Sequence, residues 1–162
     1  MFLTPTWIVP DITEMDLDAL HAKGIRGFVF DLDNTLMAPH TGRLEPRIAH
    51  WLAHLAERGF RSVVVTNNKR APYIQEAARV LGLPVLGPAG KPDTRMLRQA
   101  VTDMGLEPRQ VAVVGDRPLT DIWGGQRLGA STVLVDPLTK ATEHALIQFL
   151  RFLERLSVRV AG

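Results

Sequence analysis

Polar side chains suited to chemistry follow the apolar runs of this sequence, close to the point where each run ends. They are Asp31, Asp33 and Thr35 after residues 27–30, Thr66 and Asn67 after 61–65, Lys91 after 84–87, and Asp116 and Asp121 at and beyond the end of 110–116. Carboxylates avoid buried apolar segments unless they are paired with a cation or bind a metal. Two aspartates separated by one residue, directly behind such a run, therefore indicate a functional site.

These residue types favour a magnesium ion and a phosphate. Mg²⁺ prefers hard oxygen ligands and is usually held by one or two carboxylates together with substrate oxygens and water. A lysine and the donors of a Thr-Asn pair suit the oxygens of a phosphoryl group. The predicted chemistry is phosphoryl transfer from a phosphorylated substrate.

Strands alternate with helices along the chain, and this alternation explains how the polar groups could meet. We expect strands at 27–30, 61–65, 84–87, 110–116 and 131–137, and helices at 44–59, at about 72–81, around 96–104 and at 142–156. Such alternation predicts an α/β fold of three layers, in which helices cover both faces of a parallel sheet of about five strands. Ligands of these folds bind beyond the carboxyl ends of the strands, where the polar groups would gather.

Size and composition favour one ordinary globular domain over residues 1–162. The chain has 162 residues, of which 46% are hydrophobic, so it can bury a complete core. A formal charge of +2 is too small to indicate a nucleic-acid partner. The chain has no cysteine, which excludes disulfides and thiolate chemistry. No apolar run approaches the ~18 residues that cross a bilayer, and the start is a poor signal peptide, so we expect a cytoplasmic protein.

The set DLDNT (31–35), TNN (66–68), KP (91–92) and GDRPLTD (115–121) resembles the four motifs of the haloacid dehalogenase (HAD) superfamily of aspartate-nucleophile phosphatases. The resemblance covers residues 25–137 and implies a Rossmann-like fold. It also implies that Asp31 is the nucleophile and forms an aspartyl-phosphate. Asp33 would protonate the leaving oxygen and later deprotonate the attacking water. Asp31, the backbone carbonyl of Asp33 and the carboxylate of Asp116 would bind Mg²⁺.

The resemblance assigns supporting roles to the remaining motif residues. Thr66 and the Asn67 amide would bind phosphoryl oxygens, and Lys91 would neutralise charge on Asp31 and on the transferring group. Asp121 would orient Lys91 or a metal-bound water, and Thr35 would support the first motif.

Further details are similar to the capless subfamily IIIA, and within it to the YqeG-like group, which includes phosphatidylglycerophosphate phosphatases. Thirty-four residues separate Asp31 from Thr66 and only 24 separate Thr66 from Lys91, which leaves no room for a cap domain. One departure is Arg117-Pro118-Leu119, where this group would have Gln and a bulkier apolar pair. The best interpretation of function is a Mg²⁺-dependent phosphatase acting on phosphatidylglycerophosphate.

Two alternatives remain open at this point. One is a phosphatase for a small soluble phosphate, such as a sugar phosphate, in which a subunit of a homo-oligomer supplies the missing lid. The other is a protein-binding module that kept the fold and lost the chemistry, against which the intact Asp31, Asp33, Lys91 and Asp116 argue.

Contact with a membrane is a further hypothesis. Basic residues on loops at the predicted catalytic edge could meet an anionic lipid headgroup or surface, and these are Arg43, Lys69, Arg70 and Arg117. The amphipathic segment 142–156 could lie on a bilayer, pack on the sheet or form a dimer seam, and Trp7 and Ile8 could contact lipid or the core. His50 and His54 have the spacing of a two-histidine metal site on a helix, but no third ligand is evident, so we expect surface residues.

Overall fold

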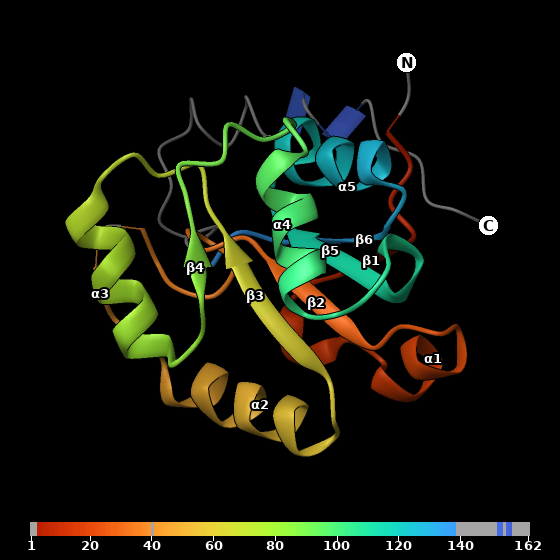
Figure 1. The fold of residues 1–162 in the computed structure, drawn as a ribbon, viewed down its shortest axis with the longest axis horizontal. Coiled ribbons are helices and arrows are strands. Elements are labelled where there is room, and N and C mark those ends of the chain that lie inside the picture. The colour runs from red at the N-terminus through yellow and green to blue at the C-terminus, as the bar shows by residue number, and fades with distance from the viewer. Residues whose placement is uncertain (1–2, 40, 139–151, 154, 157–162) are drawn as a thin grey trace.

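Six parallel strands form one sheet in the order β1-β6-β5-β2-β3-β4 (Figure 1). The computed structural model describes residues 3–39, 41–138, 152–153 and 155–156. The strands are β1 (Trp7–Val9), β2 (Gly27–Phe30), β3 (Arg61–Val65), β4 (Val85–Leu86), β5 (Val111–Gly115) and β6 (Ser131–Val135). The helices are α1 (Leu17–Ala22), α2 (Pro46–Glu57), α3 (Ala71–Leu81), α4 (Arg95–Asp103) and α5 (Trp123–Leu128).

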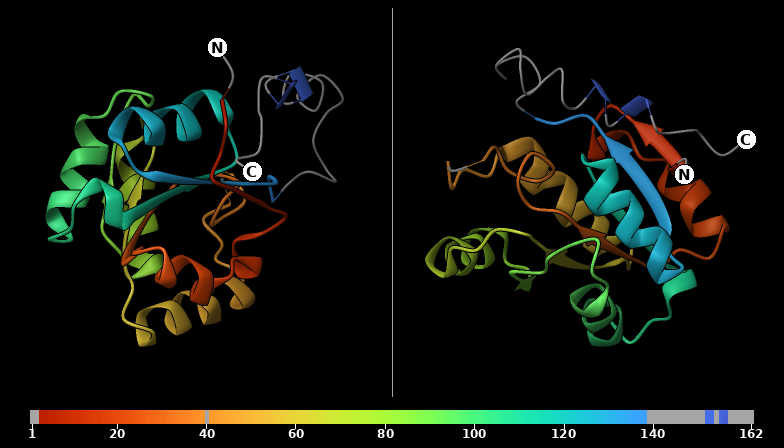
Figure 2. Two further views of the ribbon diagram at one scale, coloured as in Figure 1. Left: turned by 90° about the vertical axis from the view of Figure 1, so that its right-hand side faces the viewer. Right: turned by 90° about the horizontal axis from the view of Figure 1, so that it is seen from above.

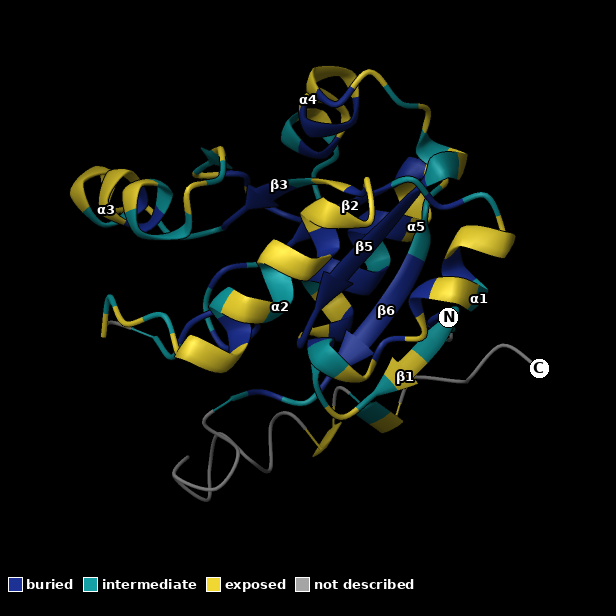
Figure 3. Ribbon diagram, turned by 90° about the horizontal axis from the view of Figure 1, so that it is seen from below, coloured by how far each residue is buried: buried dark blue, intermediate teal, exposed yellow. Residues whose placement is uncertain are grey.

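Helices cover both faces of the sheet, as Figure 2 shows. Because successive side chains of a strand point to opposite faces, β2 sends Phe28 and Phe30 into one core and Val29 into another. The first core also receives apolar residues of α1, α2 and α3, and the second receives those of α4 and α5. The inner strands are therefore dark in Figure 3, while the helices show exposed residues on their outer sides.

The central position of β2 places its carboxyl end beside those of two neighbours. Val29 of β2 is in register with Val63 of β3 on one side and with Val113 of β5 on the other. All three strands run in the same direction, so the residues that follow them meet at one edge of the sheet. This edge carries the candidate site.

The predicted α/β class and the predicted strands are confirmed, but the sheet has six strands where about five were expected. The missed strand is β1, which pairs in parallel with β6. Thr6 and Thr132 fix this pairing, since the backbone N–H of each donates to the side-chain oxygen of the other at 3.1 and 3.0 Å. Trp7 packs against the first core, whereas Ile8 is 42% exposed.

The stretch between the first motif and Lys91 contains no cap domain in its described part, residues 31–39 and 41–91. It holds only the loop after β2, then α2, β3, α3 and β4 with their short connections. The predicted helix 142–156 lies outside the described residues except for Phe152, Leu153, Arg155 and Leu156. Within the described chain, no helix combines the length and the apolar character that crossing a membrane requires.

Candidate active site

A polar pocket opens at the carboxyl edge of the sheet, where the four motifs meet. Its lining consists of Asp31, Asp33, Asn34, Thr66, Asn67, Asn68, Lys91, Asp116, Arg117 and Thr120. Six of the eight residues that the sequence predicts for the site belong to this lining. The other two contact it, since Asp121 binds Lys91, and Thr35 Oγ1 lies 3.4 Å from Asp31 Oδ2.

Lys91 lines the pocket, is itself buried and donates three hydrogen bonds. Its Nζ lies 2.8 Å from Asp31 Oδ1, 2.8 Å from Asp121 Oδ1 and 2.7 Å from the carbonyl oxygen of Val65. Every donor of the ammonium group therefore has an acceptor. This arrangement fixes the carboxylate of Asp31 from one side.

The charges of this cluster depend strongly on one another. Burial lowers the pKa of Lys91, but the neighbouring carboxylates of Asp121 and Asp31 outweigh burial and raise it above its usual range. Burial, together with repulsion from Asp31, raises the pKa of Asp121 to about 6 although Lys91 opposes the shift. Lys91 therefore stays protonated at neutral pH, and its charge holds Asp121 near Asp31 despite repulsion between the two carboxylates.

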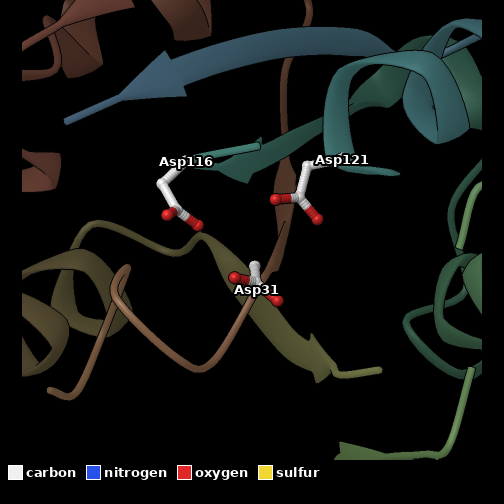
Figure 4. A group of neighbouring side chains, drawn as sticks. All are labelled: Asp31, Asp116 and Asp121. Carbon is white, nitrogen blue, oxygen red and sulfur yellow. The ribbon is translucent and has the colours of Figure 1, made fainter. Parts of the chain in front are cut away.

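Asp31, Asp116 and Asp121 bring carboxylate oxygens within 4.8 Å of one another (Figure 4). Among the described residues, no other group of three His, Cys, Asp or Glu side chains has ligand atoms this close. Three hard oxygen donors at a buried edge fit a divalent metal such as Mg²⁺. Asp121 is less suited than Asp31 as a direct ligand, because Lys91 Nζ and the backbone N–H of Arg117 donate to its two oxygens at 2.8 and 3.2 Å, whereas Asp31 Oδ2 has a contact of 3.4 Å with Thr35.

Asp121 reaches Lys91 because the backbone beneath it carries no side chain. It lies on a π-helical turn, Pro118–Ile122, which follows β5. A Cβ atom added at Gly115 would fall 2.2 Å from Asp121 Oδ2. Glycine is thus required at the end of β5 for the carboxylate to approach the strand.

The loop after β3, which carries the second motif, forms hydrogen bonds with the backbone of Lys91. The side-chain amide of Asn67 accepts from the backbone N–H of Lys91 at 2.7 Å and donates to its carbonyl oxygen at 3.1 Å. Thr66 Oγ1 accepts from the backbone N–H of Asn68 at 3.1 Å. The side chain of Asn67 therefore braces Lys91, an arrangement that the sequence did not reveal.

Asp33 lies on a tight loop after β2 and contacts residues of a different element. The loop folds back on itself, with Asn34 in the left-handed region at φ 64° and its N–H donating to the carbonyl of Met37. Tyr73 Oη donates to Asp33 Oδ1 at 2.7 Å, and Asn68 Nδ2 lies 3.4 Å from Asp33 Oδ2. Sequence reasoning missed Tyr73, because its place in an amphipathic helix indicates packing.

The remaining candidates are distributed less closely around the site. Arg117 lines the pocket, whereas Arg43, Lys69 and Arg70 are exposed on loops. Thr120, which lies within GDRPLTD but received no role, also lines the pocket. His50 and His54 are exposed on α2, as expected of surface residues.

Comparison with known proteins gives consistent matches. Residues 88–147 match the HAD-hydrolase-like family model. The chain is 31% identical to the probable phosphatase YqeG of Bacillus subtilis, over 95% of this chain and 88% of that protein. It is 38% identical to the chloroplastic phosphatidylglycerophosphate phosphatase 1 of Chlamydomonas reinhardtii, over 95% of this chain but only 60% of that longer protein.

Solved structures agree with the fold. The cobalt-bound deoxy-D-mannose-octulosonate 8-phosphate phosphatase of Haemophilus influenzae superposes with a TM-score of 0.52 at 12% identity, covering 83% of this chain and 90% of that one. At this identity the likeness concerns the fold alone.

Proposed function

The chain belongs to the HAD family of phosphatases, in its YqeG-like group, and from that premise we propose that it is a Mg²⁺-dependent phosphatase that removes phosphate from phosphatidylglycerophosphate through an aspartyl-phosphate on Asp31. The observation that carries this proposal is the buried Lys91, whose Nζ bonds Asp31 and Asp121 at the edge where four motifs meet. A buried ammonium beside two carboxylates prepares a site for the charge of a transferring phosphoryl group.

In the first step, an oxygen of Asp31 attacks phosphorus while the bond between phosphorus and the leaving oxygen breaks. Lys91 holds Asp31 Oδ1 in place during the attack. Asp33 gives its proton to the leaving oxygen, and the alcohol departs. In the second step, Asp33 takes a proton from water as that water attacks phosphorus, the bond to Asp31 breaks, and inorganic phosphate leaves with both aspartates restored.

The ion would be held by Asp31, Asp116 and the backbone carbonyl of Asp33. When bound, Mg²⁺ supplies positive charge that reduces the repulsion between the carboxylate of Asp31 and the anionic phosphate. Asp121 has a different role, because Lys91 and Arg117 occupy its oxygens. It keeps the ammonium of Lys91 in position.

We assign phosphate binding to the hydroxyl of Thr66 and the backbone N–H of Asn67, while the ammonium of Lys91, whose three donors already have acceptors, contributes its positive charge. The side-chain amide of Asn67 already bonds both backbone groups of Lys91, so the main chain is the better donor at this position. Thr66 and Asn67 lie at the end of β3, next to Asp31 at the end of β2.

A lipid phosphate fits the surroundings of this pocket. The described chain places no cap over the site, so a substrate in a membrane surface could present its headgroup directly. Arg117 at the pocket could contact a second anionic group, such as the phosphodiester of phosphatidylglycerophosphate. The similarity to the phosphatidylglycerophosphate phosphatase of Chlamydomonas reinhardtii supports the same substrate.

The test is phosphate release from a panel of phosphomonoesters in Mg²⁺ buffer. The panel contains phosphatidylglycerophosphate in mixed micelles, sugar phosphates, nucleotides and p-nitrophenyl phosphate, with Asp31→Asn as the blank. The amide is isosteric but cannot act as a nucleophile, so we expect this variant to fold and to lose turnover. Near-normal turnover would contradict the role of Asp31, and preference for a soluble phosphate would contradict the lipid substrate.

Metal dependence is tested in the same assay. Dialysis against a chelator should abolish phosphate release, and addition of Mg²⁺ should restore it. Full activity after dialysis, with no divalent ion detectable by elemental analysis, would contradict the proposed cofactor.

A further inference from the structure

We propose that Tyr73 is a positioning residue that fixes the carboxylate of Asp33 for proton transfer. The inference rests on the proposed function, in which Asp33 is the acid and base. Its basis is the contact between Tyr73 Oη and Asp33 Oδ1, which at 2.7 Å is a well-formed hydrogen bond across 40 residues of sequence. None of the four motifs contains this tyrosine.

The ring of Tyr73 is itself held firmly. Tyr73 lies in the first turn of α3, and its partly buried ring packs against the core that contains Phe28 and Phe30. Ile74 and Ala77 of the same helix are buried. The hydroxyl is therefore presented by a rigid element, whereas Asp33 lies on a loop that has no helix or strand of its own.

The two oxygens of Asp33 are bound unequally. Oδ1 accepts the 2.7 Å bond from Tyr73, while among the described residues Oδ2 has only the amide of Asn68 at 3.4 Å, close to the limit for a hydrogen bond. A donor that occupies Oδ1 leaves Oδ2 as the oxygen that can carry the transferable proton. Asn68 lines the pocket, so Oδ2 lies on the side from which substrate arrives.

This geometry predicts a dependence on the leaving group. An alkyl oxygen leaves as a strong base and needs a proton in the transition state, but p-nitrophenolate is a stable anion that leaves without one. Misplacing Asp33 should therefore slow alkyl phosphates more than aryl phosphates. A residue that only stabilises the fold would slow both equally.

The experiment compares kcat/KM for an alkyl phosphomonoester and for p-nitrophenyl phosphate in Tyr73→Phe. This change keeps the packed ring and removes the hydroxyl. We expect kcat/KM to fall on the order of ten-fold for the alkyl substrate and by less than about three-fold for the aryl one. Glu76→Gln is the matched control on α3, because Glu76 pairs with Arg79 on the exposed side and should change neither value.

Asp33→Asn separates failure of this inference from failure of the proposed function. If Asp33→Asn loses alkyl turnover but Tyr73→Phe slows both substrates equally or neither, the positioning role is wrong and the function stands. If Asp33→Asn hydrolyses the alkyl substrate normally, the acid role of Asp33 is wrong, and the inference falls with it.

A measurement without turnover tests the contact directly. Tyr73 is the chain's only tyrosine, so protein labelled with ¹³Cζ-tyrosine gives a single resonance. Asp33→Asn should shift this resonance clearly more than Asp31→Asn or Glu76→Gln, each of which also removes one negative charge. An unmoved resonance in Asp33→Asn would overturn the proposal even if Tyr73→Phe failed to fold.

Discussion

The nucleophile and the acid–base group lie two residues apart in the sequence, yet the protein holds them in different ways. Asp31 belongs to a buried ionic cluster, in which the side chains of Lys91 and Asp121 are 2% and 1% exposed. Asp33 is held by neutral donors, Tyr73 and Asn68, which come from another loop and helix.

The difference follows from what each group must do. Buried charges are costly unless they are paired, but paired charges in fixed positions stabilise a transition state without reorganising. Such a cluster suits a nucleophile that must not move. A group that gives and takes a proton changes its own charge, so a neutral hydrogen-bonded setting tolerates both of its states better than an ionic cluster would.

The largest effect should come from Lys91→Met, which removes the positive charge at the centre of the ionic cluster that holds Asp31. We expect turnover to fall at least about 10³-fold and the free energy of unfolding to drop by about 3–5 kcal/mol, because Asp121 and Asp31 lose their buried partner. Phosphate release and urea denaturation measure the two losses. Adding Asp121→Asn should recover part of the stability and none of the activity.

This variant also has a predicted pH dependence. The pKa of Asp121 is already raised to about 6, and without Lys91 it should rise further. Between the usual pKa of 3.8 and the raised value, the folded state binds more protons than the unfolded state, so stability falls as pH rises. The stability deficit of Lys91→Met should thus be smaller at pH 5 than at pH 8. An equal stability deficit at pH 5 and pH 8 would contradict the view that charge pairing with Lys91 stabilises Asp31 and Asp121.

Gly115→Ala should have an intermediate effect, since it disturbs the cluster without removing a charge. The added methyl would lie 2.2 Å from Asp121 Oδ2, so the carboxylate or the end of β5 must move. We expect turnover to fall about ten- to hundred-fold and stability by about 1–3 kcal/mol.

Gly124→Ala is the control for this change. Its added methyl would meet the flexible end of Leu97 at 3.1 Å and no carboxylate. Enzyme assays and thermal melts of both variants measure the loss of turnover and of stability, and we expect the larger losses in Gly115→Ala. Equal activity in the two alanine variants would mean that the position of Asp121 does not control the nucleophile.

The sequence predicts the convergence of the motifs because parallel strands end at one edge. Asp31, Thr66 and Asp116 each follow a strand, and the pocket brings them together. Two short segments ahead of the first motif were missed, β1 with three residues and α1 with six. Roles within the site remain predictions.

Contacts between distant segments could not be predicted in the same way. Asn67 resembles a phosphate donor in the sequence, yet its side chain bonds the backbone of Lys91, 24 residues away. Tyr73 occupies an apolar helix position, and nothing local indicates that its hydroxyl reaches Asp33. Such pairings depend on how the loops after β2, β3 and β4 meet, which no local pattern specifies.

The smallest effect should come from Asn68→Ala, which tests the weaker of the two contacts to the carboxylate of Asp33. Its amide lies 3.4 Å from Asp33 Oδ2, so we expect kcat/KM for an alkyl phosphate to fall only about two- to three-fold, less than in Tyr73→Phe. Asn68 Oδ1 also accepts from the backbone N–H of Arg70 at 2.9 Å, so Asn68→Ala removes this second hydrogen bond as well, and its absence is the other possible cause of a lower kcat/KM. Asn68→Asp distinguishes the two causes, because it keeps an acceptor for Arg70 but places a negative charge beside Asp33. Recovery of kcat/KM in Asn68→Asp would assign the effect to the turn, and a further fall would assign it to Asp33.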